Sequence, residues 1–108
     1  MMKRFGRDKT ILMEVKPLHT KVEKLIQTIY GTIVLENPKD FPRGESNLYC
    51  LTPAGTIVWK AEKPEEYTLY SRVKLSEDGA TLSTYTLSGH ACELELGTGR
   101  ILSKLSIQ

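Results

Sequence analysis

Hydrophobic and polar residues alternate along most of this chain, with the two-residue period of half-buried β-strands. The plainest example is residues 46–60, where two runs rich in β-branched and aromatic residues flank a Pro-Ala-Gly turn. The same arrangement of strand, short turn and strand returns at residues 94–105. An Asp-Gly pair at residues 78–79 is a strong hairpin signal between two further runs. The pattern therefore predicts short antiparallel strands joined by tight turns.

Counting the alternating runs gives about eight strands of ordinary length. Short connections make consecutive strands pair antiparallel. We therefore expect an all-β fold, a single antiparallel up-and-down meander that forms either a partly open barrel or two packed blade-like sheets. The runs that carry the expected strands are residues 10–16, 26–35, 46–60, 70–75, 81–87, 90–96 and 100–107.

Residues 20–30 satisfy two patterns. Their apolar positions fall at helical spacing, Thr20 and Glu23 match a capping box, and Gly31 would stop the helix. The β-branched residues of 26–35 around a single glycine suit a hairpin instead. Helix and strand both stay open here, and we favour strand because the rest of the chain is predicted to be strand.

The expected core comes from one face of each strand. On the last strand, Ile101, Ser103, Leu105 and Ile107 are predicted to face one way. The full set of predicted core residues is Ile11, Met13, Ile33, Leu35, Leu48, Cys50, Ile57, Trp59, Val73, Leu82, Leu94, Ile101 and Leu105.

Composition indicates one folded domain, because 108 residues with 40% hydrophobic and 26% charged residues can form one core. The net charge of +2 is too small to indicate a polyanionic partner. Basic residues gather near the start, so we expect residues 1–9 to be a basic N-terminal arm and residues 10–108 a single β domain. The sequence shows neither a membrane-spanning segment nor a signal peptide, which favours a cytoplasmic protein.

The two strand-turn-strand units resemble the repeat of quinoprotein-type β-propellers. In that repeat a Thr-Gly-basic turn precedes a tryptophan that docks onto the next blade. Residues 94–100 keep the turn but have Ser103 at the tryptophan position, whereas the other unit has Trp59 but a shorter turn. The layout also resembles small uncharacterised bacterial all-β proteins. A propeller needs four or more blades, so the resemblance implies a compact β-sheet domain and no quinone cofactor.

The sharpest chemical candidate is a metal site. His90 and Cys92 share a face of one expected strand, and His19 and Cys50 would complete the ligand set of a metal-dependent enzyme. Zinc ligands usually come in close pairs from turns, which this spacing lacks. A strand histidine beside a buried, reduced thiol explains the same residues, although a disulfide between the two cysteines stays open. We expect no metal and no cofactor.

Catalysis has little support in the sequence. Ser83 or Ser88 could be combined with His90 and Asp78 as a nucleophile triad, but neither serine lies in a nucleophile elbow. Nothing local lowers the pKa of either cysteine thiol. We assign no catalytic residue.

Tyrosines and two cations give the better clue to function. Several tyrosines at alternating strand positions cannot all be inside, so some are expected to form a contact patch. We therefore predict a non-catalytic protein-interaction or assembly protein that binds a protein partner or forms a homodimer. A nucleic-acid-binding module that uses the N-terminal arm and the two strand cations is an alternative, and no membrane partner is expected. The predicted binding residues are Tyr49, Tyr67, Tyr70, Arg72, Lys74 and Tyr85.

Overall fold

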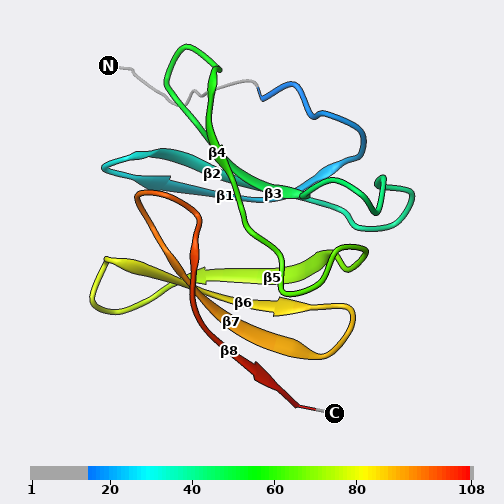
Figure 1. Cartoon of the computed structure of the whole chain (residues 1–108). Helices are drawn as coiled ribbons and strands as arrows, with labels where there is room; N and C mark the ends of the chain where they lie inside the picture. The colour runs from blue at the N-terminus through cyan, green and yellow to red at the C-terminus, as the bar shows by residue number, and fades with distance from the viewer. Residues whose placement is uncertain (1–14, 108) are drawn as a thin grey trace.

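The computed structural model describes residues 15–107, and every regular element in this range is a β-strand. The strands are β1 (Val22–Thr28), β2 (Gly31–Glu36), β3 (Leu48–Leu51), β4 (Ile57–Lys60), β5 (Tyr70–Leu75), β6 (Thr81–Thr86), β7 (His90–Glu95) and β8 (Ile101–Ser106). They form two four-stranded antiparallel sheets, with the orders β1-β2-β3-β4 and β5-β6-β7-β8 (Figure 1). This confirms the all-β antiparallel meander, and it selects two packed sheets over a barrel.

Residues 22–36 form a β-hairpin, so strand is the correct choice for most of the ambiguous stretch. Gly31 begins β2 with φ of 136°, a conformation that L-residues rarely adopt. A Cβ at this position would collide with the Leu51 carbonyl oxygen of β3, so only glycine lets the two strands approach. The strand expected at 10–16 lies mostly outside the described residues, and Val15 and Lys16 are not in a strand.

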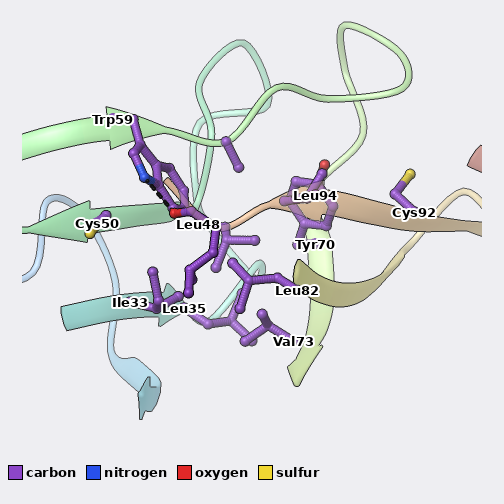
Figure 2. Close-up of a cluster of buried hydrophobic side chains, with 12 residues drawn as sticks. Ile33, Leu35, Leu48, Cys50, Trp59, Tyr70, Val73, Leu82, Cys92 and Leu94 are labelled. Atoms are coloured by element: carbon purple, nitrogen blue, oxygen red, sulfur yellow. Dashed lines mark hydrogen bonds between the residues drawn. The ribbon is translucent and has the colours of Figure 1, made fainter. Parts of the chain in front are cut away.

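The core lies between the two sheets, where one face of each sheet meets the other (Figure 2). Of the predicted core residues, eight belong to this cluster: Ile33, Leu35, Leu48, Cys50, Trp59, Val73, Leu82 and Leu94. Ile101 packs against it, and Ile57 packs against a smaller cluster formed by Val34, Tyr49 and Leu51. Ile11 and Met13 lie outside the described residues.

Leu105 is the core prediction that was wrong, because its side chain is 63% exposed. The register between β7 and β8 shifts so that Glu93 opposes Ser103 while Leu94 opposes Ile101. This bulge inserts Leu102 as an extra residue and reverses the alternation beyond it. Leu105 therefore lies opposite Ala91, on the face of the sheet that points away from the core.

Trp59 joins the two sheets. Its indole Nε1 donates a hydrogen bond of 3.1 Å to the Leu96 carbonyl oxygen, drawn as a dashed line in Figure 2. The ring also covers Gly99, where φ is 74° and where a Cβ would overlap the indole. One aromatic side chain of β4 thus holds the turn that precedes β8.

Asn47 makes a second connection between the sheets from a fully buried position. Its Oδ1 accepts a hydrogen bond of 2.9 Å from the Tyr70 backbone N–H, and its Nδ2 donates one of 2.8 Å to the Tyr70 carbonyl oxygen. The amide therefore imitates a neighbouring strand at the start of β5. This connection fixes where the edge of β5 lies relative to the first sheet.

Candidate functional site

Two of the six predicted binding residues are inside the molecule. Tyr49 is 1% exposed and Tyr70 is 0% exposed, so the expectation of a contact patch is wrong for both. The Tyr49 hydroxyl donates to the Glu36 carboxylate, and the Tyr70 hydroxyl donates to the Glu62 carbonyl oxygen. Burial raises the pKa of both phenols, and the neighbouring Glu36 carboxylate adds to the effect at Tyr49. These hydroxyls are structural groups.

Three of the remaining predicted residues meet at one groove, while Tyr67 lies apart from it. Tyr67 is 63% exposed in the connection between β4 and β5. Arg72 and Lys74 on β5 and Tyr85 on β6 line a hollow of about 480 Å³ at the edge of the second sheet. We call this hollow the cationic groove; its lining residues are Glu23, Lys24, Leu35, Ser71, Arg72, Val73, Lys74, Ser83, Thr84 and Tyr85.

The groove exists because the first sheet meets the edge of β5. Lys24 on β1 reaches across, and its Nζ donates a hydrogen bond of 2.8 Å to the Val73 carbonyl oxygen. Sequence reasoning missed Lys24, because it lies 49 residues from Val73 and no local pattern brings the two together. On the far wall Ser71 Oγ donates to the Tyr85 carbonyl oxygen at 3.1 Å. Ser83 Oγ donates to the Glu93 carboxylate at 2.8 Å.

A second exposed surface is strand β8. Three large apolar side chains on or just after β8 are exposed to solvent. They are Leu102, Leu105 and Ile107, which are 57%, 63% and 48% exposed. In the described residues β8 pairs with β7 alone, so its other edge carries no strand. Lys104 is the one charged side chain on β8. Natural proteins usually place charges or prolines on such edges, so this edge has little protection against pairing.

Glu36 is a buried carboxylate with a structural role. It is 0% exposed and accepts backbone hydrogen bonds from Leu18, His19 and Thr20 at 2.6, 3.0 and 2.8 Å. The Tyr49 hydroxyl supplies a further donor. With its oxygens engaged in this way, the carboxylate ties residues 18–20 to the outer face of the first sheet.

The residues considered as a metal-ligand set do not come together. Cys50 and Cys92 are free, buried thiols on different sheets, and His19 Nε2 lies 3.0 Å from the Glu45 carboxylate in a loop. Residues 15–107 contain no group of three or more histidine, cysteine, aspartate or glutamate side chains able to hold a metal ion. His90 Nδ1 lies 3.0 Å from Ser88 Oγ.

Ser88 and His90 of the possible nucleophile triad lie together at one end of the second sheet, whereas Asp78 lies at the other end. His90 begins β7, whereas Asp78 is in the turn between β5 and β6, where it accepts a hydrogen bond of 2.9 Å from the Ala80 backbone N–H. Register pairs Thr81, just after that turn, with Glu95 at the other end of β7 from His90. Asp78 therefore does not orient His90.

Both thiols are expected to react slowly in the folded protein. Burial raises the pKa of Cys50 and of Cys92, which lowers the thiolate fraction, and it also blocks access. At pH 8, an aromatic disulfide reagent should label the native protein at least about tenfold more slowly than the protein in denaturant. A native rate equal to that of the denatured chain would contradict this assignment, and the absorbance of the released thiolate measures both rates.

Comparison of the chain with protein-family models, with curated proteins and with solved structures finds no match. No helix in residues 15–107 has the length and the apolar character needed to cross a membrane.

Proposed function

We propose that this chain is a small, non-catalytic protein-interaction protein of the cytoplasm, and that it forms a homodimer through β8. The observation that carries the proposal is the edge of β8, where exposed leucine and isoleucine side chains accompany unpaired strand backbone. Backbone hydrogen bonds to an added strand supply affinity, and burial of the apolar side chains adds to it.

A second copy of the chain is the partner that this edge fits. Antiparallel pairing of a strand with its own symmetry mate satisfies a two-fold axis, which is the commonest symmetry of soluble oligomers. The other edge of the same sheet is already occupied, because Asn47 and Lys24 bond to the backbone of β5. Pairing along β8 would therefore produce one continuous sheet of eight strands across two copies.

The self-association is tested by measuring the molar mass in solution over a range of concentrations. We expect twice the chain mass of 12.2 kDa for the unchanged protein, and a shift toward the monomer in Leu105→Glu. That variant places a carboxylate on an exposed edge position, so it should fold normally. A matched control is Ile29→Glu, which changes an 89% exposed residue in the turn between β1 and β2.

The control should keep the mass of the unchanged protein. A monomer at every concentration, or a dimer that Leu105→Glu leaves intact, would contradict the role of β8.

The propeller-like character of the repeats belongs to the same proposal. Its support is the contact of Trp59 with Gly99, which joins two four-stranded meanders through a tryptophan and a glycine turn. Ser103 cannot repeat that contact toward a further sheet. The proposal therefore treats the two sheets of residues 15–107 as a pair of blade-like units, and it places association with a second copy at the edge of β8.

A further inference from the structure

The cationic groove holds three side-chain cations without a neutralising carboxylate. Within the described part of the chain, Lys24, Arg72 and Lys74 form no ion pair. The lining contains one acidic side chain, Glu23, so the charges around the hollow sum to a positive value. Three cations that share a hollow repel one another, and an anionic ligand relieves that repulsion.

Lys24 is already held in position at this groove. Its ammonium has three N–H donors, and the bond to the Val73 carbonyl uses one of them. The remaining donors are free to bind a ligand, while the contact with β5 restricts the side chain. Such restriction lowers the entropy that is lost when a ligand binds.

The remaining lining suits a peptide. Leu35 and Val73 line the hollow from buried positions, each 3% exposed, so the accessible apolar surface comes from the aromatic ring of Tyr85 and the aliphatic parts of the Arg72 and Lys74 side chains. The hydroxyls of Ser71 and Ser83 are polar groups at the wall. A hollow of about 480 Å³ has the size of an ordinary ligand pocket and accommodates a short stretch of extended chain. The lining thus combines positive charge with apolar surface over a short distance.

We infer that the cationic groove binds an extended peptide segment of a partner protein, in which acidic side chains alternate with apolar ones. Carboxylates of the segment pair with Arg72, Lys74 and Lys24, and an apolar side chain packs against the ring of Tyr85. The inference adds an acidic partner to the proposed interaction function. It does not depend on the homodimer, because the groove lies at the β5 edge of the sheet and β8 forms the opposite edge.

A nucleic acid fits the groove less well. Proteins that bind single strands stack successive bases on several aromatic side chains, and this lining contains one, Tyr85. Glu23 would repel a phosphate backbone, whereas a peptide can place an apolar or neutral residue beside it. The observations therefore favour carboxylates carried by a peptide over a chain of phosphates.

The test uses a fluorescent hexapeptide of alternating glutamate and valine and measures its anisotropy with the full-length protein. The same peptide with glutamine in place of glutamate reports the contribution of charge, and a labelled oligothymidylate represents a nucleic acid. We expect saturable binding of the glutamate peptide, and a loss of at least about tenfold in affinity for the double variant R72E/K74E. The matched control is K39E/R43E, which reverses two exposed cations in the loop between β2 and β3.

Retention of binding in the control and weak binding of the glutamine peptide would support the inference. It would be overturned if the unchanged protein does not bind the glutamate peptide, or if R72E/K74E binds it normally. Tighter binding of oligothymidylate, with affinity that falls steeply as salt rises, would also overturn it in favour of nucleic acid. The molar mass in solution is measured on the same samples. Peptide binding tests the cationic groove and molar mass tests the β8 homodimer, so each proposal can fail independently of the other.

Discussion

Replacing Trp59 by alanine is expected to lower the free energy of unfolding by about 3–5 kcal/mol. Domains of this size are stable by about 5–15 kcal/mol in total, so the variant should be largely destabilised or unfolded. The reason is that this one side chain both belongs to the core and joins the sheets. It packs over Gly99 and donates to the Leu96 carbonyl, which would be left buried without its partner.

Two further variants separate these contributions. Trp59→Phe keeps an aromatic ring but removes the indole N–H, and its stability should lie between those of the unchanged protein and the alanine variant. Gly99→Ala leaves the tryptophan intact but adds a Cβ that overlaps the ring, at a φ of 74° that alanine disfavours. Urea denaturation followed by far-ultraviolet circular dichroism measures all three. A loss of less than about 1 kcal/mol in Trp59→Ala would show that the two sheets do not depend on this contact.

The strands could be predicted because the patterns that indicate them lie within short stretches of sequence. Alternation and turn residues mark β3 to β7, and the glycine of the first hairpin lies where two β-branched runs meet. Pairing of β1 with β2 makes residues 22–28 a strand, and the close approach to Leu51 explains why the residue after the turn is glycine. Periodicity alone left the choice between helix and strand open, because the apolar residues of β1 also satisfy a helical spacing.

Burial of individual side chains was less predictable, because it depends on what covers each face. Tyr49 faces away from the core between the sheets, yet it is buried among Val34, Leu51 and Val15 and is bonded to Glu36. Leu105 was predicted to be buried but is exposed, because the alternating pattern does not reveal the one-residue bulge at Leu102.

The cationic groove was half predictable. Arg72, Lys74 and Tyr85 are close on neighbouring strands, and alternation indicates that the two cations share a face. Lys24 and the hollow itself arise from packing of one sheet against the edge of the other, which depends on Asn47 and Trp59. No motif in the sequence encodes that packing.

Replacing Glu36 by glutamine is expected to lower the free energy of unfolding by about 3 kcal/mol at neutral pH. The carboxylate accepts backbone hydrogen bonds from Leu18, His19 and Thr20 as well as the bond from Tyr49. Glutamine offers one acceptor oxygen and an amide that donates, so some of the backbone N–H groups and the Tyr49 hydroxyl would lose their acceptor. The charge that strengthens these bonds would also be lost.

The stability that Glu36→Gln loses should be largest at neutral pH and should become smaller on acidification. Burial alone would raise the pKa of Glu36, but the bonds from Tyr49 and from the three backbone N–H groups outweigh it and lower the pKa below the ordinary value of 4.5. A group with a lowered pKa in the folded state contributes its full stabilisation above the ordinary value, and it loses that contribution as the pH falls through the folded-state pKa. The unchanged protein should therefore approach Glu36→Gln in stability on acidification.

Urea denaturation of both proteins from neutral pH down to about pH 2, followed by Trp59 fluorescence, measures the difference. It should be largest at neutral pH and should narrow below pH 4.5, the ordinary value for this carboxyl. Glu77→Gln, an exposed change in the turn between β5 and β6, provides the control, and it should match the unchanged protein at every pH. A difference for Glu36→Gln that stays constant or grows on acidification would mean that the carboxylate is not the group that holds residues 18–20, because protonation removes the charge that those hydrogen bonds require.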